Sequence, residues 1–205
     1  RCLWCHNPES ISPEPLLSFL ADKCISCGDC VPVCPNQAHV MDDQQKHIFL
    51  RDQCDTCGDC AKICPSGALE IIGKDLSYEE VLETALRDRL FYEDSGGGVT
   101  LSGGEPLLQI DFAEALLEGV HKAGVHTAVE TAGHVMFNRI ERVMPHTDLF
   151  LFDLKETDNS RHKEFTGVPN TRIIDNLKSL HDADASVLVR MPTIPGLNDR
   201  QEHFE

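Results

Sequence analysis

The chain has 205 residues, 41% of them hydrophobic, which is enough to bury one sizeable core and a smaller one. Its formal net charge of -16 argues against nucleic acid as a partner and against docking on anionic membrane surfaces. No apolar run approaches the roughly 18 residues of a spanning helix, and the sequence shows no secretory leader.

The chain opens with Arg1-Cys2-Leu3-Trp4-Cys5-His6, in which two residues separate the two cysteines. A tight turn brings thiolates at this spacing to one side, where they can hold one metal ion or cluster. Zinc and a redox-active pair are alternatives for so short a motif. Because the chain begins with Arg rather than Met, we expect these residues to be the remaining part of a Cys-x3-Cys-x2-Cys loop whose first cysteine lies upstream.

Ten cysteines in a chain of this length indicate either disulfides or metal sites. Disulfide scaffolds are usually short and secreted, whereas clustered cysteines in an enzyme-sized chain are typical of metal binding. The clustering therefore favours metal in a reducing, cytoplasmic compartment.

Eight of the cysteines form two runs that repeat with a period of thirty residues, which indicates an internal duplication. The spacing C-x2-C-x2-C-x3-C-P resembles that of bacterial two-cluster ferredoxins, and the resemblance covers residues 22–72. A pair of zinc ribbons is the alternative, but four cysteines this close crowd a tetrahedral ion. The runs are Cys24, Cys27, Cys30 and Cys34 before Pro35, and Cys54, Cys57, Cys60 and Cys64 before Pro65.

The ferredoxin resemblance implies cross-ligation, in which the fourth cysteine of each run serves the other cluster. Gly28 and Gly58 would let the backbone wrap closely around inorganic sulfide. One [4Fe-4S] cluster would take Cys24, Cys27, Cys30 and Cys64, and the second would take Cys54, Cys57, Cys60 and Cys34.

After this insert, strands are predicted to alternate with helices, which implies a parallel sheet with right-handed crossovers. The first helix, over 76–92, opens with a capping box from Ser77 to Glu80. The pattern leaves a barrel and an open sheet as alternatives. The expected strands are 99–102, 125–130, 148–154 and 187–191, and the other helices are 111–123, 137–144, 171–181 and one that begins in 198–205.

Polar residues gather where the predicted strands end. In barrels and open sheets alike, the carboxyl ends of parallel strands form the rim at which ligands bind. The four strand ends carry Ser102-Gly103-Gly104-Glu105-Pro106, Glu130-Thr131, Asp153-Leu154-Lys155 and Arg190.

Together these motifs resemble the radical S-adenosylmethionine (SAM) superfamily, and within it the glycyl-radical-enzyme activating enzymes of the pyruvate formate-lyase activating enzyme family. The matching segments are 2–9, 95–107, Thr131, 153–155 and 190–196. The insert resembles that of the larger subgroup. The resemblance implies a partial (βα)6-type radical SAM barrel with an inserted bacterial ferredoxin-like 2x[4Fe-4S] domain. Its parts would be residues 1–21, the insert 22–72 and the incomplete barrel body 73–205.

The resemblance also implies an anaerobic chemistry. A [4Fe-4S] cluster bound by three cysteines would chelate SAM through its open iron and cleave it reductively. The resulting 5'-deoxyadenosyl radical would take the α-hydrogen of a glycine in a partner glycyl radical enzyme. Flavodoxin or ferredoxin would donate the electrons, and the two extra clusters would relay them.

The resemblance also implies roles for particular residues. Cys2 and Cys5 would bind the catalytic cluster, and Lys155 would act at the reaction site. Trp4 would pack near the adenine, with core packing as its alternative, and His6 would reach a cluster sulfur, the partner or only the surface. The remaining SAM-binding residues would be Gly103, Gly104 and Glu105 at the methionine moiety, and Glu130, Thr131, Asp153, Lys155 and Arg190 along the pocket, with the carboxylates holding a monovalent cation.

One departure concerns the family's first cluster cysteine, which would lie four residues before Cys2. The family's last strand and final helices are also expected beyond the chain, so the fragment alone is expected to be inactive. Two rival functions remain open. One is a small-molecule radical SAM enzyme, and the other is a ferredoxin-type electron carrier with a non-catalytic βα body.

Overall fold

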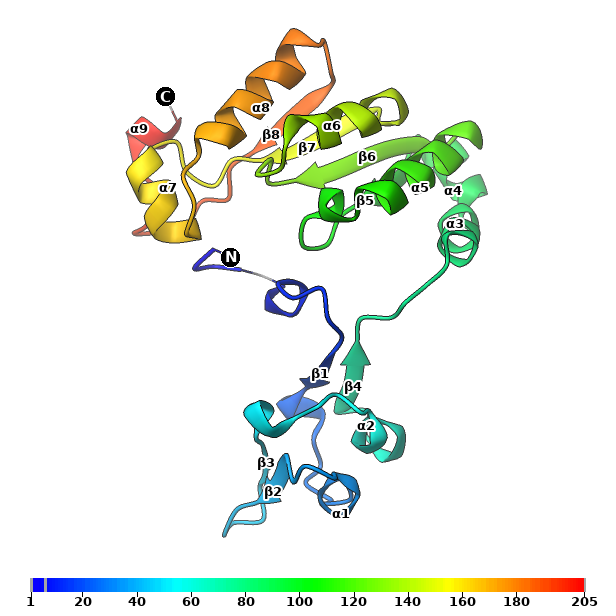
Figure 1. The fold of residues 1–205 in the computed structure, drawn as a ribbon, viewed down its shortest axis with the longest axis vertical. Helices are drawn as coiled ribbons and strands as arrows, with labels where there is room; N and C mark the ends of the chain where they lie inside the picture. The colour runs from blue at the N-terminus through cyan, green and yellow to red at the C-terminus, as the bar shows by residue number, and fades with distance from the viewer. Residues whose placement is uncertain (1, 6, 205) are drawn as a thin grey trace. The chain divides into compact units, whose positions relative to one another are not determined.

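The computed structural model describes residues 2–5 and 7–204. The chain divides into two compact units. The larger, here called the body, comprises Arg1–Pro8 and Leu76–Glu205, and the smaller, here called the insert, comprises Glu9–Asp75 (Figure 1). No helix in the described part of the chain is both long and apolar enough to cross a membrane.

The body is built on a four-stranded sheet in the order β5-β6-β7-β8, in which every neighbouring pair is parallel. This confirms the predicted parallel sheet. Its polar strand ends therefore lie along a single edge. The strands are β5 (Gly98–Leu101), β6 (His126–Thr131), β7 (Leu149–Asp153) and β8 (Val187–Arg190).

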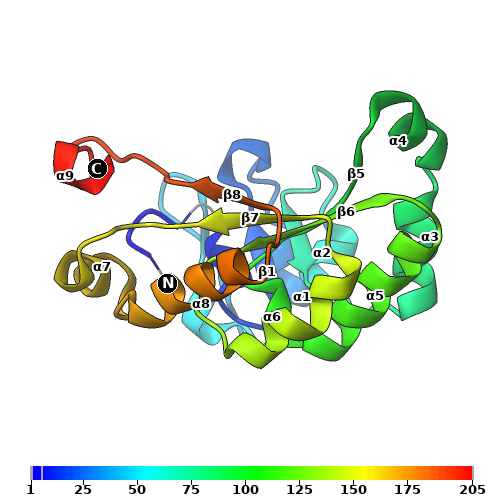
Figure 2. The ribbon, with the colours of Figure 1, turned by 90° about the horizontal axis from the view of Figure 1, so that it is seen from above.

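Three helices cover one face of this sheet: α5 (Ile110–Lys122), α6 (Phe137–Val143) and α8 (Thr171–Asp182) (Figure 2). Their apolar sides face the strands because hydrophobic residues recur at helical spacing. The buried core between the layers includes Leu117, Val129, Ile140, Phe150, Phe152 and Leu180.

Two of the predicted helices need correction. The single helix over 76–92 is two, α3 (Tyr78–Leu86) and α4 (Arg89–Ser95), because Asp88 leaves helical geometry at φ -97° and ψ 19°. The helix expected in 198–205 starts later, as α9 (Gln201–Phe204), because the Asn198 side chain accepts from the Ile194 amide in a turn.

Helix α7 (Asn159–Thr166) was not expected at all. Its sequence is almost wholly polar, so it lacks the apolar periodicity that reveals a helix. The local signal is its cap, since the Asp158 side chain accepts from the Arg161 amide at 2.8 Å.

The insert consists of two similar halves. Strands β1 (Leu16–Phe19) and β4 (Leu69–Ile72) form one antiparallel pair, and β2 (His39–Met41) and β3 (His47–Phe49) form the other. Gly28 at φ +81° and Gly58 at φ +82° occupy corresponding turns, which a side chain would strain. The short helices are α1 (Cys30–Val33) and α2 (Asp59–Ile63), with 3-10 turns at Ala21–Lys23 and Arg51–Gln53.

The remaining 3-10 turns are Pro8–Ser10, Pro106–Gln109 and Met144–His146. The second of these, η4, lies directly after the glycine-rich turn at the end of β5.

Candidate functional site

The carboxyl edge of the sheet carries a charged array centred on Arg190. Its guanidinium lies 2.5 Å from Glu130 Oε1 and 2.7 Å from Asp153 Oδ1, which joins the ends of β8, β6 and β7. Lys155 Nζ lies 2.6 Å from the other oxygen of Asp153. Ser102 donates a hydrogen bond to Glu130 at 3.0 Å, so the end of β5 is included. Four predicted site residues therefore form one connected network.

The network is only partly shielded from solvent. Asp153 is the most enclosed member, with 14% of its side chain exposed, against 36% for Arg190. The hydrogen bond from Arg190 to Glu130 is the main cause that raises the pKa of Arg190, followed by its bond to Asp153. Two carboxylates and two cations are held together at a solvent-reachable edge. Such an edge can bind a zwitterion by exchanging internal ion pairs for pairs with the ligand.

Glu105 ties the glycine-rich turn to the end of β6. Thr131 Oγ1 donates to its carboxylate at 2.9 Å, and the Ala132 amide donates at 3.1 Å. The same carboxylate caps η4 at the Leu107 amide. Burial raises the pKa of Glu105, and these hydrogen bonds act in the opposite direction. Gly103, at φ +133°, supplies the backbone conformation that leads into this turn.

The N-terminal cysteine loop belongs to the body. The Cys5 amide donates to the Cys2 carbonyl at 3.2 Å, which closes the expected tight turn. The Leu3 amide donates to the Phe165 carbonyl at 2.8 Å, and the Trp4 ring lies 5.5 Å from the Phe165 ring. His6 lies outside the described residues.

The indole N–H of Trp4 is buried and has no hydrogen-bond partner among the described residues. A buried donor without an acceptor is costly, so it marks a place where a ligand acceptor would be favourable. This observation fits the bound nucleoside that the motif implies. The contact with Phe165 fits the packing alternative equally, and both uses are compatible.

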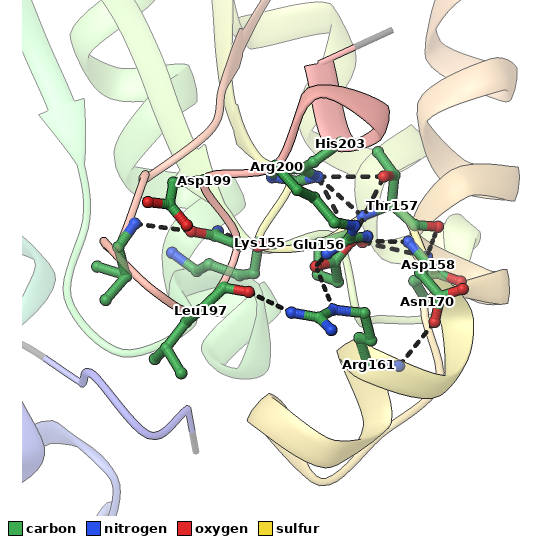
Figure 3. Close-up of polar contacts among 12 residues, drawn as sticks. Lys155, Glu156, Thr157, Asp158, Arg161, Asn170, Leu197, Asp199, Arg200 and His203 are labelled. Atoms are coloured by element: carbon green, nitrogen blue, oxygen red, sulfur yellow. Dashed lines mark hydrogen bonds and ion pairs between the residues drawn. The ribbon is translucent and has the colours of Figure 1, made fainter.

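A buried carboxylate that the sequence analysis did not identify lies directly after Lys155 (Figure 3). Glu156 is fully buried, and both its oxygens accept from Arg200 at 2.6 Å. Burial raises the pKa of Glu156, but the hydrogen bonds from Arg200 and from the Asp158 amide outweigh it and lower the pKa to about 2. No sequence pattern links Glu156 to Arg200, because they are far apart in the chain and neither lies in a periodic element.

The same network fixes the backbone beside Lys155. The Asn198 side chain donates to the Lys155 carbonyl at 2.9 Å, and the Asn170 side chain donates to the Glu156 carbonyl at 3.1 Å. The loop that presents Lys155 is therefore held from two later segments of the chain. This anchoring reduces the conformational entropy that Lys155 would lose on binding a ligand.

In the insert, four cysteines from both runs line one pocket. Backbone amides also point at cysteine sulfurs elsewhere in the insert, since Ala38 donates to Cys34 Sγ at 3.2 Å and Thr56 donates to Cys54 Sγ at 3.4 Å. Such N–H···S bonds are typical around iron–sulfur clusters. The pocket is lined by Cys24, Cys27, Cys30 and Cys64, with Gly28, His47 and Leu69 among its other residues.

The remaining cysteines of the insert are also grouped. Burial raises the pKa of Cys60 to about 11, and the neighbouring thiols of Cys54, Cys34 and Cys57 raise it further. All ten cysteines of the chain are free, and none forms a disulfide. Two sets of four convergent thiols, each with members from both runs, fit four-iron clusters better than a disulfide scaffold.

Comparison with known proteins agrees with this geometry. The radical SAM superfamily model matches residues 1–205, so the chain belongs to that superfamily of SAM-dependent iron–sulfur enzymes. Within it, the chain belongs to the glycyl-radical-enzyme activating enzymes. It is 41% identical to the trans-4-hydroxy-L-proline dehydratase activating enzyme of Clostridioides difficile, over 100% of this chain and 68% of that protein.

Other activating enzymes are similarly related. The choline trimethylamine-lyase activating enzyme of Oleidesulfovibrio alaskensis is 41% identical, over 98% of this chain and 66% of that protein. The benzylsuccinate synthase activating enzyme of Thauera aromatica is 43% identical, over 97% and 62%. The chain thus spans about two thirds of the length of these relatives.

A solved domain of a pyruvate-formate lyase-activating enzyme from Bacteroides vulgatus shares the fold. It matches with a TM-score of 0.50 and 36% identity, over 52% of this chain and 66% of that one. The family assignment confirms the predicted class, that of radical SAM oxidoreductases with a [4Fe-4S] cluster and SAM.

Proposed function

We propose that the protein to which this chain belongs installs a glycyl radical on a partner enzyme. The supporting observation is the 38% to 43% identity to activating enzymes of different glycyl radical enzymes, over nearly the whole chain. When bound, the catalytic cluster and SAM would supply one-electron cleavage of the sulfonium and the hydrogen-atom abstraction at the glycine α-carbon.

The chain's own residues would bind and orient the SAM molecule. Cys2 and Cys5 would supply two of the cluster's three thiolates. Lys155, released from Asp153, would pair with the carboxylate of the methionine moiety, and the freed Asp153 oxygen would accept from its ammonium group. The Trp4 N–H would donate to the nucleoside.

The carbonyls of the glycine-rich turn would complete this site. Gly103 and Gly104 would let the backbone approach the methionine moiety, beside the Glu105 carboxylate and Thr131. Glu130 and Asp153 would also hold a monovalent cation, sharing their carboxylates with Arg190. SAM affinity is therefore expected to change when sodium is replaced by a larger cation.

The decisive experiment uses the full-length protein, reconstituted without oxygen and given a reductant and SAM. With a glycyl radical enzyme present, we expect 5'-deoxyadenosine and the glycyl radical's electron paramagnetic resonance (EPR) signal. Turnover with a small molecule alone would instead identify a small-molecule radical SAM enzyme. Absence of any SAM-induced change in a cluster signal would favour an electron carrier.

We further propose that the insert binds two ferredoxin-like [4Fe-4S] clusters and relays electrons from flavodoxin or ferredoxin. The support is the grouping of Cys24, Cys27, Cys30 and Cys64 around one pocket. Cys27→Ala and Cys57→Ala are each expected to reduce the rate of activation. The variants are compared at equal content of the catalytic cluster. Undiminished activation in a folded variant would contradict the relay.

A further inference from the structure

Two buried histidines lie between the strands of one half of the insert. His39 is 1% exposed and His47 is 5% exposed, and they come from paired strands β2 and β3. His39 Nδ1 lies 2.9 Å from His47 Nε2, and His47 Nδ1 lies 3.8 Å from Cys24 Sγ. The two rings therefore form a short chain that ends on a proposed cluster ligand.

Aromatic rings hold this pair in place. Phe19 packs edge-on against His47 with 4.7 Å between ring centroids, and Phe49 stacks on His39 at 5.1 Å. These contacts restrain the plane of each imidazole. The hydrogen bond between the two rings then determines which nitrogens face each other.

The 2.9 Å contact contains one proton, because two N–H groups, or two bare nitrogens, would repel. If His39 Nδ1 donates, His47 Nε2 accepts, and the proton of His47 sits on Nδ1, facing Cys24 Sγ. If His47 donates instead, a bare nitrogen faces the thiolate and a buried His39 N–H has no acceptor among the described residues. The first arrangement is favoured, since a metal-bound thiolate accepts hydrogen bonds.

The other half of the insert has no such pair. Shifting by thirty residues places Leu17 at the position of His47 and Leu69 at that of His39. The strand registers agree: His47 lies opposite Met41, and Leu17 opposite Ile71. Both leucines are buried, at 2% and 4% exposure. The other half of the duplication therefore has a buried leucine pair at the positions that correspond to the histidine pair.

We propose that His47, oriented by His39, donates a hydrogen bond to Cys24 Sγ and raises the reduction potential of that cluster above that of its duplicate. The inference rests on the proposed ferredoxin-like clusters. A donor aimed at a ligand sulfur stabilises the reduced cluster, which carries the extra negative charge. The electron entering the insert then resides preferentially on the cluster bound by Cys24, Cys27, Cys30 and Cys64.

The test is an EPR-monitored redox titration of the full-length, reconstituted protein. The variant H39L/H47L copies the leucine pair that the other half already accommodates, so it is expected to fold and keep its iron and sulfide. We expect one insert cluster to become harder to reduce by about tenfold, or about 59 mV for a one-electron couple, with the other unchanged. H39L alone is expected to produce a smaller shift of the same sign.

Two further measurements distinguish the possible failures. The reverse variant L17H, at the position that corresponds to His47, is expected to raise the second cluster's potential, and pulsed EPR with ¹⁵N-histidine should show a weak coupling that H47L abolishes. Unchanged potentials at full iron content would overturn the inference alone. A strong ¹⁵N coupling would also overturn it, because Cys30, His39 and His47 would then ligate a metal directly, their ligand atoms lying within 4.8 Å. Absence of insert clusters from the wild type would overturn the relay as well.

Discussion

The body and the insert are stabilised by different means. The body buries a continuous apolar core that includes Phe150, Phe152 and Ile140, and its buried carboxylate Glu156 pairs with Arg200. The insert has a small hydrophobic cluster, and two of the four buried residues in that cluster, Cys30 and Cys60, are proposed cluster ligands. Its strands and helices have only three to five residues each. The body resembles an independent domain, whereas the insert resembles a segment that would fold around the proposed clusters.

This difference predicts that the proposed clusters contribute most of the insert's folding free energy. Short elements with a few apolar side chains cannot offset the conformational entropy of ordering more than sixty residues, from Glu9 to Asp75. In metal-dependent domains, the free energy of metal binding supplies the free energy of folding.

The largest expected effect is therefore that of removing iron. In protein from which the iron has been chelated under reducing conditions, amides of Glu9–Asp75 are expected to lose their protection from hydrogen exchange. Amides of β6 and β7 in the body should remain protected. The measurement is hydrogen exchange followed by mass spectrometry. Equal protection of both units without iron would show that the insert folds by itself.

The next effect concerns the body alone. Glu156→Ala removes the fully buried partner of Arg200 and is expected to cost about 3 kcal/mol of unfolding free energy, the lower end for breaking a buried pair, because the Arg200 side chain keeps 26% of its exposure to water. The matched control is Arg142→Ala, which breaks an exposed cluster with Asp111 and Glu114 and should cost at most about 1 kcal/mol. Chemical denaturation followed by the circular dichroism of the helices measures both. Similar costs for the two variants would contradict the structural role of Glu156.

How far the sequence determines these features depends on the range of the interaction. The strands ending at Thr131 and Asp153 were predictable because apolar runs and turn residues are local signals. So was the grouping of polar strand ends, since parallel strands bring them to one edge. The pairing of Arg190 with both Glu130 and Asp153 is an example of what that rule anticipates.

The features that the sequence did not reveal depend on contacts between distant segments or on weak local geometry. Glu156 meets Arg200 only because two loops fold together at the strand ends. His39 and His47 lie in short strands, and the corresponding positions in the other half of the insert are leucines. The internal repeat therefore did not predict a polar pair. The break at Asp88 and the polar helix α7 are local, but neither carries a strong apolar pattern.

The pH dependence of the body's stability is expected to be similar to, or slightly smaller than, the effect of Glu156→Ala. The pKa of Glu156 falls from 4.5 to about 2 on folding. The stabilisation is therefore complete above pH 4.5 and is lost as the pH falls through about 2, amounting to about 3 kcal/mol. Denaturation midpoints of the wild type should fall over this range more steeply than those of Glu156→Gln. Parallel curves would show that other carboxylates dominate.

The smallest expected effect tests whether a local interaction in the body can be weakened without changing the stability of the insert. Ser77 caps α3 in a full capping box, with its hydroxyl accepting from the Glu80 amide and its own amide donating to the Glu80 side chain. Ser77→Ala is expected to cost about 1 kcal/mol, because one helix-end amide loses its acceptor while the exposed site admits water. Ser77→Asp keeps an acceptor at this position and should restore most of the loss. Hydrogen exchange should show the change in α3 and not in the insert. A comparable loss of protection around Cys24 or Cys54 would mean that the two units unfold cooperatively, and that the cofactor-dependent and core-dependent parts of the chain are not energetically separate.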